Sequence, residues 1–194
     1  MTEEKEGCQG GWVKEGQNDA ISRELAGAMA AGKAPQFEVV RFEANNGWVD
    51  ESSSRIKIDL ALILDGQLVQ VLDERVIEER PKNGAAFDGR LGSIDVMECA
   101  LRRALQERWP EIRQYLEKVE IVSYCAFTAD YKQSHHVQVT FKIICDKDET
   151  PRAVVREGVD TIGKTRYTLV TIFRWLAWRL LRRLRGEKRA RGEC

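Results

Sequence analysis

The stretch RIKIDLALILDGQLVQVLDE, residues 55–74, decides the fold. Isoleucine and leucine recur at every second position from Ile56 to Leu62, with charged residues between them at the start. This period of two is typical of a strand that presents one face to a hydrophobic core. Asp65-Gly66 predicts a two-residue hairpin turn, because both residues tolerate a positive φ. A second strand, Leu68 to about Glu74, is therefore expected to pair with the first.

A third strand and a short helix are predicted before this hairpin. Phe37 to Glu43 is rich in strand-forming residues and ends at Asn45-Asn46-Gly47, which signals a turn. The run from Asn18 to about Ala31 predicts a helix, capped by Asn18 or Asp19 and stopped by Gly32. Its weak apolar stripe consists of Ile21, Leu25 and Met29.

A glycine-rich loop, NGAAFDGRLGS at residues 83–93, leads from the hairpin into a second predicted helix. Ser93 is a natural N-cap, and Asp95 lies in the first turn, where the helix dipole favours an acidic side chain. Trp109-Pro110 ends this helix, and one or two further turns follow from Glu111 to Leu116. The apolar residues at helical spacing are Ile94, Met97, Leu101, Ala104 and Leu105.

The same order of elements then repeats, about eighty residues further on. Strands are predicted at Val119 to Phe127, at residues 137–143 and at Arg152 to Val159, with Thr128-Ala129-Asp130 beginning the first connection. A long helix, about Thr165 to Arg185, closes the repeat. Its stripe consists of Leu169, Phe173, Leu176, Leu180 and Leu184.

The predicted class is therefore α+β, with two β-β-β-α units packed as one pseudo-symmetric domain. Helices on one face of antiparallel sheets bury both sets of apolar residues. The domain is expected over residues 36–185, with halves at about 37–116 and 117–185. Residues 1–35 are expected to form a flexible N-terminus with the short helix, and residues 186–194 a basic tail.

Composition favours a cytoplasmic protein without a disulfide framework. Lys+Arg and Asp+Glu are equal at 31 each, so net charge gives no case for nucleic acid or an anionic membrane as partner. The start, MTEEKEGCQGG, does not have the pattern of a signal peptide, and no apolar run approaches the ~20 residues of a membrane span. The cysteines are odd in number and have no CxxC spacing, which argues against a disulfide framework or a zinc site. We expect them to be small buried side chains. They are Cys8, Cys99, Cys125, Cys145 and Cys194.

Motif searches of the sequence favour no catalytic, metal or cofactor site. The Gly89–Ser93 loop has neither the Walker A nor the GxGxxG pattern, and GxSxG and HExxH patterns are missing from the sequence. His135 and His136 are adjacent in or beside a predicted strand, where neighbouring side chains point to opposite faces and do not readily share a metal. The loop Gly89–Ser93 before a helix has two interpretations, an anion-binding loop or an ordinary capped loop.

The C-terminal stretch RWLAWRLLRRLRGEKRARG, residues 174–192, also has two interpretations. A basic amphipathic helix of this type binds an anionic membrane surface or nucleic acid. Alternatively it is a core helix with a basic outer face, which we favour because its apolar stripe suits a β-β-β-α half. The width of that stripe also allows a protein–protein interface. The basic residues around Trp175 and Trp178 are Arg174, Arg179, Arg182, Arg183, Arg185, Lys188, Arg189 and Arg191.

One segment, GSIDVMECALRRAL at residues 92–105, resembles the C-terminal regulatory (dimerisation) domain of 2-isopropylmalate synthase and citramalate synthase. In that family a Gly-x-Gly-Pro-Val-Asp/Asn-Ala loop opens a helix that continues as Ala-Leu-x-x-Ala-Leu. The resemblance spans about Phe37 to Leu184, and within it Pro110-Glu111-Ile112, after the helix, resembles the family's aromatic-Pro segment. It departs at Ser93, where the family has proline, and at residues 163–167, which match the second helix start poorly.

The resemblance implies a non-catalytic domain that forms a homodimer and binds leucine or isoleucine at the dimer interface. The implied effector-binding residues are Gly92, Ser93, Ile94 and Asp95 in the first half, and Gly158, Val159 and Asp160 in the second. The family's acyl transfer needs a catalytic barrel of about 250 residues and a His-x-His metal pair. This 194-residue chain has no His-x-His and is too short for that barrel, so the resemblance implies a domain in leucine biosynthesis that either acts alone or regulates a separate synthase. The alternative function is an interaction, nucleic-acid or membrane-surface module that uses the basic helix.

Overall fold

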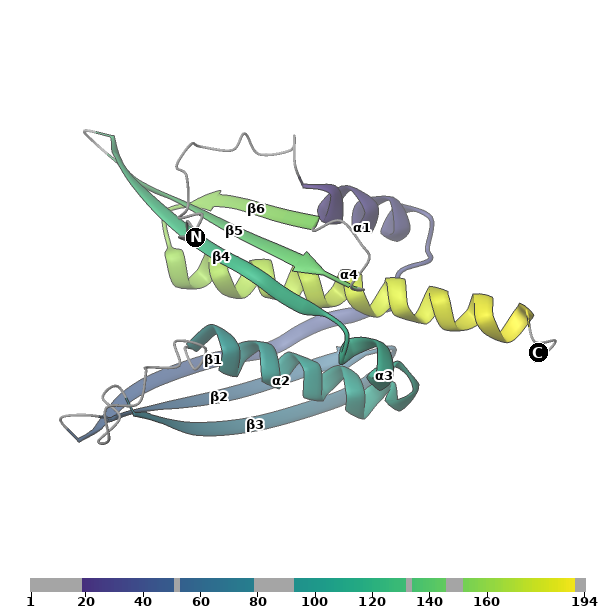
Figure 1. The fold of residues 1–194 in the computed structure, drawn as a ribbon, viewed down its shortest axis with the longest axis horizontal. Helices are drawn as coiled ribbons and strands as arrows, with labels where there is room; N and C mark the ends of the chain where they lie inside the picture. Colours follow the sequence, from purple (N-terminus) through teal and green to yellow (C-terminus); the bar gives the residue numbers. More distant parts are fainter. Residues whose placement is uncertain (1–18, 51–52, 79–92, 132–133, 146–151, 191–194) are drawn as a thin grey trace, which may run out of the picture.

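The computed structural model describes residues 19–50, 53–78, 93–131, 134–145 and 152–190. Its order of elements confirms the predicted α+β class, two β-β-β-α units after an N-terminal helix (Figure 1). The elements are α1 (Ala20–Ala30), β1 (Phe37–Asp50), β2 (Ser53–Leu64), β3 (Gln67–Glu78), α2 (Ser93–Arg108), η1 (Pro110–Ile112), α3 (Arg113–Leu116), β4 (Glu120–Tyr131), β5 (Ser134–Ile144), β6 (Arg152–Gly158) and α4 (Thr161–Ala190).

The strands form two antiparallel sheets, in the order β1-β2-β3 and β4-β5-β6. The predicted hairpin turn is confirmed: Leu64 pairs with Gln67, and the turn residues Asp65 and Gly66 have φ of 46° and 78°. The predicted alternation along β2 is confirmed too, since every second side chain from Ile56 to Leu64 is buried. These side chains form the inner face of the first sheet.

Two turns predicted from local sequence are wrong. β1 continues through Asn45-Asn46-Gly47 to Asp50, and Asn45 lies opposite Lys57. β4 likewise continues through Thr128-Ala129-Asp130 to Tyr131. In each case the long central strand of the sheet offers a continuous row of backbone partners. Their hydrogen bonds outweigh the turn preference of a few residues.

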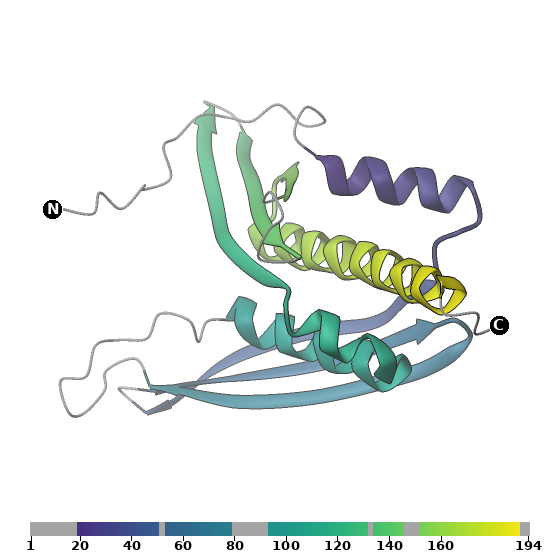
Figure 2. The same ribbon diagram turned by 45° about the vertical axis from the view of Figure 1, so that its right-hand side comes forward.

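Each sheet is covered by the helix that follows it. α2 packs on β2 and β3, α4 packs on β5 and β6, and the two helices also contact each other. In Figures 1 and 2 both helices lie between the two sheets, with α1 beside α4 and β6. One core cluster therefore joins both halves, and it includes Leu60, Leu101, Phe141 and Trp175. No helix in the described part of the chain is long and apolar enough to cross a membrane.

The first strand of each half carries a matching irregularity. The pairing register shifts between Val39 and Arg41 in β1 and between Ile121 and Ser123 in β4. Both shifts fall within the first few residues of the strand, and such bulges bend a strand and increase its twist. The halves therefore share a local backbone feature as well as their order of elements, although their sequences differ.

Arg102 on α2 connects the two halves. Its Nε donates to Glu98 Oε1 at 2.7 Å, and its terminal nitrogens donate to the carbonyl oxygens of Leu116 and Val119, the latter at 2.6 Å. The guanidinium carbon lies 6.0 Å from the ring centre of Phe173 on α4. One side chain thus holds the end of the first half, the approach to β4 and the last helix together.

The short helix α1 is part of the core. The Asp19 carboxylate caps it by accepting a hydrogen bond from the Ser22 backbone N–H at 2.8 Å. Ile21 and Leu25 are buried as predicted, but the stripe continues at Ala28, because Met29 is 46% exposed. Gly32, with φ of 61°, follows the last turn as predicted.

Candidate functional site

The residues implied as effector-binding lie at or near the N-terminal ends of α2 and α4. Gly92 lies outside the described residues, Ser93 is the first residue of α2, and Ile94 and Asp95 are half-buried in its first turn. Gly158 ends β6, and exposed Val159 and Asp160 connect it to α4. Both helices begin at the same side of the domain in Figures 1 and 2. The two sets of residues therefore share one region of the fold.

Asp160 caps α4. Its Oδ1 accepts a hydrogen bond from the Ile162 backbone N–H at 3.0 Å, and its carbonyl oxygen accepts one from Lys164 N–H at 2.9 Å. The first bond satisfies an amide that has no partner within the helix, and the second is the first bond of the helix itself. The other carboxylate oxygen, Oδ2, lies over Gly163, where an added Cβ would be only 2.3 Å away. Glycine at 163 therefore lets the carboxylate fold back onto the helix.

A second close contact fixes the approach to α4. The Lys164 side chain lies across Gly158, so a Cβ at that position would be 2.0 Å from Lys164 Cε. Val159 is 72% exposed and Ile162 is 61% exposed. The start of α4 thus carries a carboxylate, an ammonium group and two exposed aliphatic side chains within seven residues. These three kinds of group are complementary to the ammonium, carboxylate and side chain of an aliphatic amino acid.

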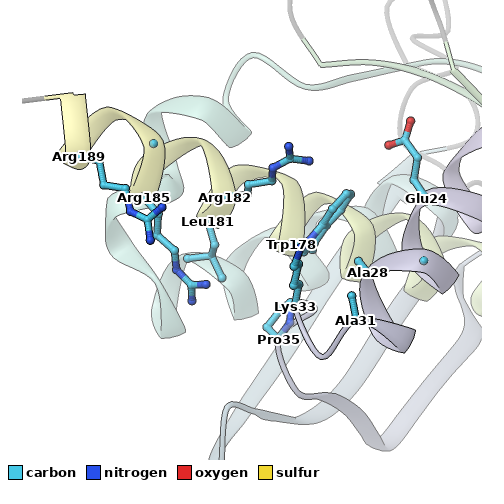
Figure 3. Close-up of a pocket in the computed structure, with 12 residues that line it drawn as sticks. Glu24, Ala28, Ala31, Lys33, Pro35, Trp178, Leu181, Arg182, Arg185 and Arg189 are labelled. Atoms are coloured by element: carbon cyan, nitrogen blue, oxygen red, sulfur yellow. The ribbon is translucent and has the colours of Figure 1, made fainter.

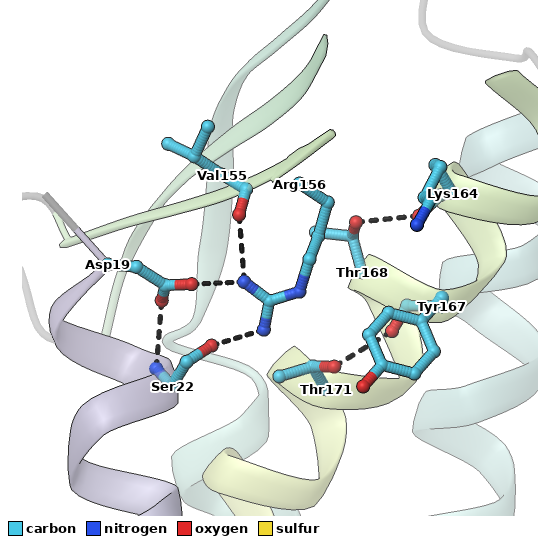
Figure 4. Close-up of polar contacts among 8 residues, drawn as sticks. All are labelled: Asp19, Ser22, Val155, Arg156, Lys164, Tyr167, Thr168 and Thr171. Carbon is cyan, nitrogen blue, oxygen red and sulfur yellow. Dashed lines mark hydrogen bonds and ion pairs between the residues drawn. The ribbon is translucent and has the colours of Figure 1, made fainter. Parts of the chain in front are cut away.

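Arg156 on β6 holds α1 in place (Figure 4). Its guanidinium forms an ion pair with Asp19 and donates to Ser22 Oγ and, at 2.8 Å, to the Val155 carbonyl oxygen. It also lies 5.7 Å from the ring centre of Tyr167 on α4. Sequence reasoning missed this network because Asp19 and Arg156 are 137 residues apart.

Glu24 forms a second connection between α1 and α4. Partial burial acts to raise the pKa of its carboxyl, but hydrogen bonds from Trp175 and Arg152 and the charges of Arg152 and Arg179 outweigh that effect. The net result is a pKa below the ordinary value of 4.5. The bond from Trp175 Nε1 to Glu24 Oε2 measures 2.9 Å. Glu24 therefore stabilises the contact most strongly when it is ionised.

The basic C-terminal helix is a core helix, as favoured from its sequence, and it continues as a helix beyond Arg185 to Ala190. Part of the segment expected as a tail is therefore helical. Arg183 Nε pairs with Glu187 Oε1 at 3.1 Å, and Tyr115 Oη donates to Glu187 Oε2 at 2.5 Å. The buried residues of α4 are Thr165, Thr168, Leu169, Thr171, Ile172, Phe173, Trp175, Leu176, Ala177, Leu180 and Leu181.

The cysteines and histidines form no metal cluster in the described part of the chain, where no group of three or more His, Cys, Asp or Glu residues is placed to hold an ion. Cys145 is buried and Cys99 is half-buried, and both are free thiols. Cys8 and Cys194 lie outside the described residues. Cys125 lies on β4, and His135 and His136 lie on β5.

A comparison of the sequence with known protein families finds no match, and a comparison with curated proteins finds none either.

Proposed function

We propose that this chain is a non-catalytic regulatory domain that binds a branched-chain amino acid, in the manner of the 2-isopropylmalate synthase domain that residues 92–105 resemble. The observation that carries the proposal is the combination of groups at the start of α4. Asp160 offers an exposed carboxylate for the effector's ammonium group, and Lys164 offers a cation for its carboxylate. Val159 and Ile162 offer apolar contacts for its side chain.

The first half adds a second set of contacts under this proposal. The first turn of α2, Ser93 to Asp95, begins at the same side of the domain, and its backbone N–H groups favour an anion. Val159 and Ile162 stay exposed in the single chain, and such residues are commonly covered in a dimer. The proposal therefore includes a homodimer that covers the effector, and a separate synthase as the regulated partner.

The test is calorimetric titration with leucine, isoleucine and valine, repeated on Asp160→Asn. Asparagine caps a helix about as well as aspartate, so this variant keeps the fold and removes the charge. We expect binding of at least one of the three by the wild type and a loss of about tenfold or more in Asp160→Asn. Glu157→Gln, on β6 next to the site, is the matched control for charge removal.

A wild type that binds none of the three amino acids contradicts the proposal. Equal weakening by Asp160→Asn and Glu157→Gln would place binding elsewhere and contradict the assigned site.

A further inference from the structure

A groove separates α1 from the C-terminal part of α4, away from the start of α4 (Figure 3). Its volume is about 600 Å³, within the range typical of small-molecule sites. Trp178 and Leu181 line it from α4, and Ala28 lines it from α1, with Lys33 and Pro35 on the segment that follows α1. Half of the groove therefore comes from residues 24–35 and half from residues 178–189.

Four cations line this groove: Lys33, Arg182, Arg185 and Arg189. No carboxylate among the described residues forms an ion pair with any of them. The groove has one acidic lining residue, Glu24, and that carboxylate already accepts hydrogen bonds from Arg152 and Trp175. The positive charge of the groove thus stays uncompensated within the described chain, although the whole sequence is neutral.

Two glycines line the groove without a local structural reason. Gly27 lies inside α1 and Gly186 inside α4, and a Cβ at either position would meet nothing within 4 Å. Neither has the positive φ that favours glycine. Glycine inside a helix is less stable than alanine by about 0.5–1 kcal/mol. Their absence of side chains instead leaves space on both walls of the groove.

We propose that this groove binds a small organic polyphosphate, of the nucleoside di- or triphosphate class. Arginine and lysine bind phosphate oxygens through charge-assisted hydrogen bonds, and four such side chains match two or more negative charges. The indole of Trp178 lies in the groove wall, with the Arg182 guanidinium carbon 5.8 Å from its ring centre, and its remaining surface can contact a base. A concave site between two helices suits a small ligand better than a nucleic acid strand, which needs an extended basic surface.

Calorimetric titrations with ATP and with inorganic pyrophosphate test the proposal. We expect both to bind, ATP more tightly, and affinity to fall with added salt. Arg185→Gln and Arg189→Gln, both exposed on α4, should each weaken ATP binding by about tenfold. Lys188→Gln, on the same helix but outside the groove, should leave affinity within about twofold.

A steric pair of variants gives a second readout that does not depend on charge. Gly27→Leu fills the groove and should abolish binding, whereas Ala26→Leu, its exposed neighbour outside the groove, should not. No ATP or pyrophosphate binding by the wild type would overturn the proposal, as would equal weakening by Lys188→Gln. Binding only to a single-stranded oligonucleotide or to vesicles with phosphatidylserine would overturn it too. Asp160→Asn should leave ATP binding unchanged, so the proposal for this groove and the proposal for the amino-acid site can be refuted independently.

Discussion

Removing the Arg156 guanidinium gives a sharp stability test of the fold, because its ion pair with Asp19 is more buried than the Arg152–Glu24 pair that also joins β6 to α1. The side chains of Arg156 and Asp19 are 13% and 5% exposed, so the pair is largely withdrawn from water. Arg156→Met replaces the apolar stem of the side chain, removes the guanidinium and leaves the Asp19 carboxylate buried without its cation. Breaking a buried ion pair in this way typically lowers the free energy of unfolding by about 3–5 kcal/mol.

The size of this effect is large compared with the whole stability of a domain, about 5–15 kcal/mol. With a urea m-value of about 2–3 kcal/mol/M, the unfolding midpoint should fall by about 1–2 M. Asp19→Asn should also destabilise, although asparagine keeps the cap on Ser22, because Arg156 then lacks its anion. The double variant leaves no unpaired charge. Its loss of unfolding free energy should therefore be smaller than the sum of the two single losses by about 2 kcal/mol or more.

Urea denaturation followed by far-ultraviolet circular dichroism measures all four proteins of this cycle. If the loss in the double variant equals the sum of the two single losses to within about 0.5 kcal/mol, Asp19 and Arg156 act independently, and the reasoning is refuted. Unchanged midpoints for both single variants would show that the Asp19–Arg156 pair does not hold α1 in place.

Two further predictions concern Glu24 and the core. The pKa of the Glu24 carboxyl is lowered by folding, so its contribution is present above about pH 4.5 and is lost as pH falls through the lower folded value. Urea titrations should show Glu24→Gln less stable than the wild type at pH 7 by under about 1 kcal/mol, since the Glu24 side chain is 38% exposed, and this difference should shrink as pH is lowered below 4.5. Leu101 is fully buried, so Leu101→Ala should lower the free energy of unfolding by about 2–5 kcal/mol. Leu72 is 65% exposed, so Leu72→Ala should change it by less than about 0.5 kcal/mol. Thermal melting measures both variants. Equal melting temperatures for these two variants would contradict the assigned core.

The fold could be predicted because its strongest signals are local and repeated. The alternation from Ile56 to Leu62, followed by Asp65-Gly66, determines the second and third strands without knowledge of the rest of the chain. The wrong turns at Asn45–Gly47 and Thr128–Asp130 have one cause. The preference for a turn is a property of three residues, whereas strand pairing depends on a partner strand that those residues do not reveal.

The sites were less accessible from the sequence for a related reason. The excess of arginine on α4 was plain, but the groove also needs Gly27 and Lys33, about 150 residues earlier, and no local pattern connects them. The position of Asp160 near a helix start was predicted, but not that Gly163 lets its carboxylate fold over the first turn. Contacts of this kind depend on packing rather than on residue type.

Amide chemical-shift mapping during a leucine titration tests the central claim most directly. The proposed function predicts that the largest ¹H–¹⁵N shifts occur at Val159, Ile162 and Gly163, together with the first turn of α2 from Ser93 to Val96. Asp160→Asn should abolish those shifts while leaving the rest of the spectrum unchanged. A spectrum that does not respond to leucine, isoleucine or valine, or that responds only away from these two helix starts, would contradict the account.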